Sequence, residues 1–158
     1  QEPGAFPQAR APVRLDDLAR STVADFAPQA AHRGIDLGID ETCETSIEGH
    51  ADALRILLGN LIDNALRYTP AQGRVDVCIR PLGEGIALEV CDNGPGIPDD
   101  ELPRVLDRFY RVAGSETEGS GLGLAIVQQI ATAHGARLEL ANRLQGGLSA
   151  KVIFKKQK

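Results

Sequence analysis

Asn60-Leu61-Ile62-Asp63-Asn64-Ala65-Leu66-Arg67-Tyr68 is the stretch that decides the fold of this 158-residue chain. Apolar residues recur through it and before it at spacings of three and four, which predicts an amphipathic helix over Ala51–Tyr68. At about 100° per residue, Asn60, Asn64 and Arg67 fall in a stripe roughly 60° wide at the margin of the apolar flank. Polar groups at the edge of a buried face are costly unless a polar partner meets them. The stripe therefore indicates either a half-exposed helix edge or a ligand site. The apolar flank consists of Leu54, Leu57, Leu58, Leu61, Ala65 and Leu66.

The length and composition predict one domain with a hydrophobic core, since 42% of the 158 residues are hydrophobic. Residues 1–12, rich in Pro, Gly, Ala and Gln, indicate a linker or frayed terminus, and residues 13–158 form the predicted domain. Because residue 1 is Gln, we expect the chain to begin inside a longer protein. No apolar run of about 18 residues and no secretory signal is present, so we expect no direct membrane contact by this domain.

The net charge of −5 disfavours a general nucleic-acid binder. It does not exclude a phosphate ligand, because charges are screened beyond about 8–10 Å at physiological salt and local cations decide such a site. Cys43, Cys78 and Cys91 are scattered and have no CxxC spacing. This pattern indicates reduced thiols in a cytoplasmic setting rather than a disulfide framework or a zinc site.

Patterned segments precede the central helix. Val13–Leu15 indicates a short edge strand, and Asp16 or Asp17 suits the start of a helix that runs to about His32 and ends at Gly34. Alternating apolar residues predict strands at 35–39 and 45–47. The inner side of the helix would carry Leu18, Val23, Phe26 and Ala30.

After the central helix, alternation over Arg74–Arg80 and Ile86–Val90 predicts an antiparallel hairpin. A helix is predicted at Leu122–His134, and two strands at 137–141 and 148–154 close the chain. Because these elements do not alternate as regular βαβ units, they predict an α+β two-layer sandwich. Its mixed, mostly antiparallel sheet would be covered on one face by about three helices.

Two features of this frame carry chemistry. Asp92 follows Ile86, Leu88 and Val90 at a spacing of two, so it should lie on the same inward face at the end of the strand. A carboxylate in that position needs a hydrogen-bond donor. The run 119–124 is glycine-rich and opens a helix, which is typical of an anion site. It lacks the Lys and Ser/Thr of a P-loop and the spacing of a dinucleotide motif, so both are rejected.

Together these residues resemble four boxes, called N, G1, F and G2, of the ATP-binding catalytic domain of bacterial sensor histidine kinases. That family belongs to the Bergerat-fold ATPases, with gyrase, Hsp90 and MutL, and the resemblance runs from about Val13 to Phe154. In order, the boxes are Asn60-x-x-x-Asn64-x-x-Arg67-Tyr68, then Asp92-x-Gly94-x-Gly96, then Phe109, and then Gly119-x-Gly121-Leu122-Gly123-Leu124.

The resemblance implies a role for each residue toward ATP and Mg²⁺. Asp92 would accept a hydrogen bond from the adenine amine, and Asn64 would bind Mg²⁺ through its amide oxygen, a hard ligand for a hard cation. Asn60 would support the metal or phosphate end, Arg67 would reach a phosphate, and Tyr68 would lie along the nucleotide.

The resemblance also implies a lid over the nucleotide at about 98–120, anchored by Phe109. Arg111 would meet the γ-phosphate, with Arg108 as a second candidate. The glycines would shape the site and the lid hinges. The remaining residues expected at ATP are Gly94, Gly96, Ile97, Gly119, Ser120, Gly121, Leu122, Gly123 and Leu124.

One residue separates two reactions. The gyrase and Hsp90 branches have a Glu four residues before the Mg²⁺-binding Asn, where this chain has Asn60. An amide cannot take a proton at neutral pH, whereas a histidine is largely neutral and nucleophilic already, so Asn60 favours transfer to histidine over hydrolysis. The acceptor is missing, because His32, His50 and His134 lack the family's following acidic residue and nearby Pro. We expect His134 to end a helix, where a cation suits the dipole.

The sequence thus predicts the catalytic domain of a two-component histidine kinase that transfers the ATP γ-phosphate to a histidine outside this chain. Expected partners are the parent homodimer's own phosphoacceptor helices and a response regulator, with the parent anchored in the bacterial inner membrane and this domain in the cytoplasm. The alternatives are an ATP-hydrolysing conformational machine of the Hsp90 or gyrase type and a nucleotide-binding scaffold without turnover.

Overall fold

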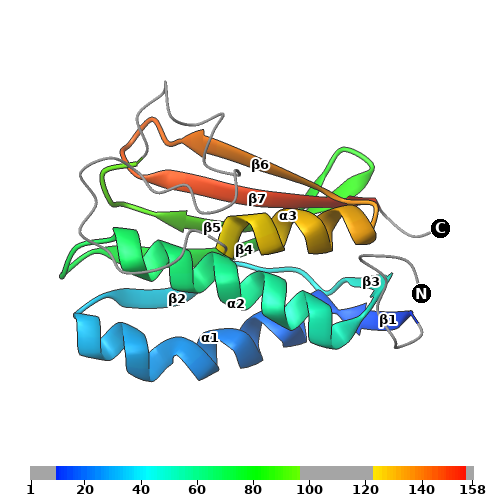
Figure 1. Ribbon diagram of the computed structural model, residues 1–158, viewed down its shortest axis with the longest axis horizontal. Helices are drawn as coiled ribbons and strands as arrows, with labels where there is room; N and C mark the ends of the chain where they lie inside the picture. Colours follow the sequence, from blue (N-terminus) through cyan, green and yellow to red (C-terminus); the bar gives the residue numbers. More distant parts are fainter. Residues whose placement is uncertain (1–9, 97–122, 156–158) are drawn as a thin grey trace.

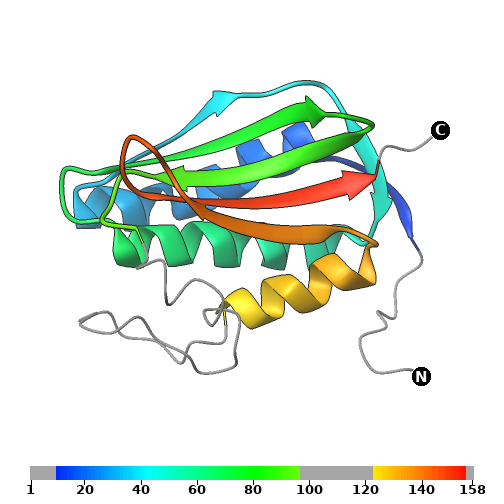
Figure 2. The ribbon, with the colours of Figure 1, turned by 90° about the horizontal axis from the view of Figure 1, so that it is seen from above.

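The computed structural model describes residues 10–96 and 123–155. In this part of the chain, helices α1 (Leu15–Arg33), α2 (Ala51–Tyr68) and α3 (Gly123–Ala133) form one layer, which covers one face of a sheet (Figures 1 and 2). The predicted α+β two-layer sandwich is confirmed. The expected lid at 98–120 lies outside the described residues. No helix among those described is long and apolar enough to span a membrane.

The sheet has five strands in the order β2-β4-β5-β7-β6. The pair β2–β4 is parallel and the other neighbours are antiparallel, so the predicted mixed sheet is confirmed. A separate antiparallel ribbon joins β1 and β3. The strands are β1 (Ala11–Arg14), β2 (Asp36–Glu41), β3 (Ser46–Gly49), β4 (Arg74–Leu82), β5 (Gly85–Asp92), β6 (Arg137–Asn142) and β7 (Leu148–Lys155).

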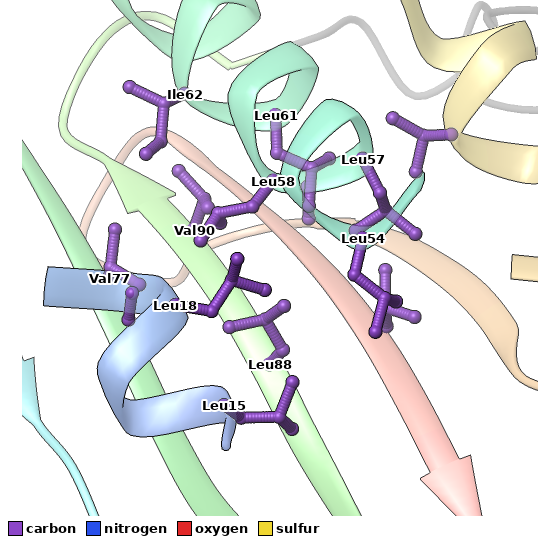
Figure 3. Close-up of a cluster of buried hydrophobic side chains, with 14 of the residues drawn as sticks. Leu15, Leu18, Leu54, Leu57, Leu58, Leu61, Ile62, Val77, Leu88 and Val90 are labelled. Atoms are coloured by element: carbon purple, nitrogen blue, oxygen red, sulfur yellow. The ribbon is translucent and has the colours of Figure 1, made fainter. Parts of the chain in front are cut away.

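Helix α2 has the predicted bounds, and its apolar flank forms the centre of the core. Leu54, Leu57 and Leu58 are fully buried. Figure 3 shows them beside Leu88 of β5 and Leu15 of α1, so the core joins both layers. The inward parity predicted for β4 and β5 is confirmed, because Val75, Val77, Ile79, Ile86, Leu88 and Val90 are at most 4% exposed.

The start of α1 differs from the prediction. The helix begins at Leu15 and its N-cap residue is Arg14, which makes no side-chain cap hydrogen bond. Asp16 is buried in the first turn, where Arg14 Nη2 and Arg20 Nη2 donate to its carboxylate. The hydrogen bonds from Arg14 hold the pKa of Asp16 well below its usual range. The predicted capping role of Asp16 or Asp17 is therefore wrong, whereas the end at Gly34, with φ 71°, is confirmed.

Helices α2 and α3 lie side by side and run antiparallel, so the end of α3 meets the start of α2 (Figure 1). His134 bridges them. The backbone N–H of His50 donates to His134 Nε2 at 3.1 Å, so His134 Nδ1 carries the proton and donates to the Ile130 carbonyl oxygen at 2.9 Å. Burial lowers the pKa of His134. The expectation of a cation at this helix end is wrong, because Nε2 accepts a hydrogen bond and a protonated ring has no acceptor nitrogen.

The buried flank of α2 should dominate stability. We expect Leu58→Ala, at a fully buried position, to lower the free energy of unfolding by about 2–5 kcal/mol. The matched control is Ile56→Ala on the same helix, where the side chain is 53% exposed and the loss should stay within about 0.5 kcal/mol. Urea denaturation followed by circular dichroism measures both, and equal losses would contradict this account of the core.

The bridge through His134 should make stability pH-dependent. Because its pKa in the folded chain lies below the unfolded value of about 6.5, the unfolded state takes up the proton first as pH falls. The stability that neutral His134 contributes is thus present above about pH 6.5 and is lost as pH falls toward the folded pKa. His134→Gln keeps an acceptor without titrating, so its urea midpoint should fall less between pH 7 and pH 5. An equal fall in both proteins would refute the assignment.

Candidate functional site

The polar stripe of α2 lies where the helix periodicity places it. Asn60, Asn64, Arg67 and Tyr68 are half-buried, beside fully buried neighbours on the same helix. The predicted helix edge is therefore present, and α3 runs alongside it. Two amide oxygens one turn apart at such an edge are hard donors of the kind that Mg²⁺ takes together with phosphate oxygens and water.

Asp92 ends β5 and is 4% exposed, as its parity predicts. The donor that a buried carboxylate requires comes from the backbone, because Gly94 N donates to Asp92 Oδ1 at 2.9 Å and Leu148 N to the same oxygen at 3.2 Å. Burial raises the pKa of Asp92, while these N–H donors and the nearby charge of Arg143 oppose the rise. The carboxylate is thus held by one of its oxygens.

The backbone at Gly94 brings Asp92 close to the end of α2. A Cβ at this position would lie 2.8 Å from the Tyr68 carbonyl oxygen and 3.3 Å from Asp92 Oδ1. Glycine is needed here because a side chain would collide with the α2 backbone. Asn64 lies one helical turn before Tyr68, about 6 Å along the axis. The strand end and the polar stripe therefore belong to one neighbourhood.

Arg67 takes part in a network on the helix surface. Its Nε donates to Asp63 Oδ2 at 2.9 Å, one turn earlier on α2. Gln29 Nε2, on α1, donates to the other oxygen of Asp63 at 3.1 Å. The guanidinium is thereby turned back along the helix toward Asp63, and its contact with a phosphate stays a prediction.

The turn between β6 and β7 also belongs to this neighbourhood, which the sequence did not reveal. Arg143 Nη1 donates to the Asp92 carbonyl oxygen at 2.8 Å. A Cβ at Gly147 would lie 1.9 Å from that same oxygen, and a Cβ at Gly96 would lie 2.6 Å from Asn142 Oδ1. The turn backbone is therefore pressed against the segment that carries Asp92, Gly94 and Gly96. No sequence spacing could have found this contact, because Arg143 and Asp92 are 51 residues apart.

The G2 box is described only from its last two residues. Gly123 opens α3, and Leu124 is 8% exposed and belongs to the core, so the predicted helix start holds at this end. Within residues 10–96 and 123–155, no group of three or more His, Cys, Asp and Glu side chains could hold a metal ion. The other expected site residues lie outside the described residues: Ile97, Arg108, Phe109, Arg111, Gly119, Ser120, Gly121 and Leu122.

The contact at Gly147 should be sterically strict. Gly146 and Gly147 both have positive φ, at 103° and 95°, but nothing lies within 4 Å of a Cβ at Gly146. Alanine at either position carries the backbone strain, and only Gly147→Ala adds the collision with Asp92. We expect Gly147→Ala to lose about 1–3 kcal/mol more stability than Gly146→Ala. Thermal unfolding measures both, and equal shifts in Tm would contradict the contact.

Comparison with known proteins agrees with this geometry. A family model for histidine kinase-, DNA gyrase B- and HSP90-like ATPases matches residues 49–158. The sensor protein QseC of Escherichia coli (strain K12) is 41% identical over 145 residues, which cover 91% of this chain and 31% of QseC. The chain therefore spans about a third of the length of this curated relative.

Solved structures give the same result. The mycobacterial sensor histidine kinase MprB matches with a TM-score of 0.82 and 28% identity, over 93% of this chain and all of that one. Full-length ShkA matches with a TM-score of 0.83 and 27% identity, over 98% of this chain and 32% of ShkA. The chain belongs to the family of histidine kinase-, DNA gyrase B- and HSP90-like ATPases, and the members that it resembles are sensor histidine kinases.

Proposed function

We propose that this domain binds Mg-ATP and presents its γ-phosphate to a histidine on phosphoacceptor helices of the parent protein. The observation that carries the proposal is Asp92, a buried carboxylate at a strand end whose Oδ1 is held by two backbone N–H groups. A carboxylate so held can accept a hydrogen bond from an exocyclic amine through its other oxygen. The related ShkA was solved in complex with AMPPNP, which supports an adenine nucleotide as the ligand.

The polar stripe of α2 would hold the phosphate end. Asn64 would bind Mg²⁺ through its amide oxygen, with Asn60 beside it, and Arg67 would contact a phosphate oxygen from its place on the same edge. Bound magnesium would supply positive charge that offsets the charge of the transferring phosphoryl group. Arg111 and Arg108, with Phe109 in the lid, are proposed to complete this end.

Asn60 determines the type of reaction that we propose. An amide cannot act as a general base, so Asn60, four residues before Asn64, cannot activate a water molecule for attack on the phosphate. A neutral histidine needs no such base to attack phosphorus. We therefore favour transfer to histidine over hydrolysis, with the parent homodimer's own helices as acceptor and a response regulator as the next partner. The parent would be anchored in the inner membrane, with this domain in the cytoplasm.

Nucleotide binding tests the first part. Titration calorimetry with AMPPNP and Mg²⁺ should show binding by the wild-type chain and at least about a tenfold loss in Asp92→Asn, because an amide –NH₂ faces the adenine amine where an acceptor stood. The control is Asp76→Asn on β4, whose side chain pairs with Arg74 instead. The absence of wild-type binding, or equal affinity in Asp92→Asn, would refute the site.

Phosphotransfer tests the second part. With γ-labelled ATP, the chain alone should release phosphate no faster than background, and it should label acceptor helices of the parent protein when these are added. The label should be acid-labile, as expected of phosphohistidine. Steady phosphate release by the chain alone would instead support a conformational ATPase, and tight binding without transfer or release would support a scaffold.

A further inference from the structure

The turn between β6 and β7 and the first residue of β7 hold Asp92 by two hydrogen bonds. Arg143 Nη1 donates to the Asp92 carbonyl oxygen at 2.8 Å, and Leu148 N, at the start of β7, donates to Asp92 Oδ1 at 3.2 Å. Both the backbone and the carboxylate of Asp92 are therefore anchored by this one turn. These contacts lie outside the four boxes that the sequence analysis identified.

The turn itself is closed and fits closely against β5. Arg143 N donates to the Gly147 carbonyl oxygen at 2.8 Å, and Gly146 N donates to the Arg143 carbonyl oxygen at 3.0 Å. Because a Cβ at Gly147 would lie 1.9 Å from the Asp92 carbonyl oxygen, the two backbones are in direct contact. Arg143 is thus held at its backbone by the hydrogen bonds of its own turn and at its guanidinium by the Asp92 carbonyl oxygen.

Two backbone donors hold one carboxylate oxygen of Asp92. The hydrogen bonds that its carboxylate accepts in the described part of the chain both reach Oδ1. Under the proposed function, Oδ2 would be the oxygen that accepts from a nucleobase. Since a hydrogen bond weakens steeply as its angle departs from linear, the direction of Oδ2 decides how well a base amine is distinguished from a base carbonyl.

We propose that Arg143 is a positioning residue for base selectivity, which acts through Asp92 to favour a purine with an exocyclic amine over one with a carbonyl at the same place. The proposal deepens the proposed function and rests on it. Removing the guanidinium would release the Asp92 backbone and remove a nearby positive charge. That charge is among the groups that oppose the burial-raised pKa of Asp92, so it favours the ionised, accepting form.

The test compares two diphosphates that differ in one group. ADP carries an amine at purine position 6 and IDP carries a carbonyl, so the ratio of their dissociation constants reports base reading and not phosphate binding. We expect Arg143→Ala to weaken the binding of Mg-ADP by about tenfold and to leave the binding of Mg-IDP nearly unchanged. The preference for ADP over IDP would then fall by about tenfold. Arg143→Lys keeps a charged donor and should restore most of the ratio.

The control is Arg137→Ala on β6, an arginine that is 70% exposed and pairs with Glu139. It should keep the wild-type ratio. If Arg143→Ala does not fold by circular dichroism, Arg143→Met keeps the aliphatic part of the side chain and carries the test. Equal weakening of ADP and IDP, or an unchanged ratio, would overturn the role of Arg143. A wild-type chain that binds neither nucleotide would instead refute the proposed function.

Discussion

The structure depends on one constraint, the orientation of α2 about its own axis. Its apolar flank is buried against the sheet, and its margin must at the same time keep Asn60, Asn64 and Arg67 half-exposed. A rotation that buried the amides would leave polar groups without partners and would expose leucines to water. Core packing therefore sets the direction of the polar stripe, so the same contacts stabilise the domain and orient its proposed ligand donors.

Much of this follows from the sequence, because the relevant rules are local. The bounds of α2 came from a three–four apolar repeat that no proline or glycine pair interrupts. The alternation of apolar residues along β5 predicted the inward position of Asp92, since strand side chains alternate between the two faces of a sheet. Both predictions need only neighbours in the chain. The same holds for Gly34, where a left-handed residue ends α1.

The predictions that failed are those in which distant or competing contacts outweighed a local preference. Asp16 is a good capping residue by type, but Arg14 and Arg20 hold its carboxylate inside the first turn. His134 suits a helix end as a cation, but packing against α2 buries it and makes the neutral form the stable one. The β1–β3 ribbon, and the turn that anchors Asp92, are pairings across many residues, which no local pattern encodes.

The two ends of the site are consequently built in different ways. Among the described residues, the proposed phosphate end lies on one helix, and a magnesium ion that keeps several waters would need only one protein amide to place it. The proposed base end would require a fixed hydrogen-bond direction, and its described residues come from β5, the end of α2 and the β6–β7 turn. Under this proposal, substitutions at the base end would change base selectivity without moving the groups proposed to meet phosphate. Since directional recognition tolerates less displacement than a hydrated ion, the hydrogen bonds that hold Asp92 suit the proposed reading of the base.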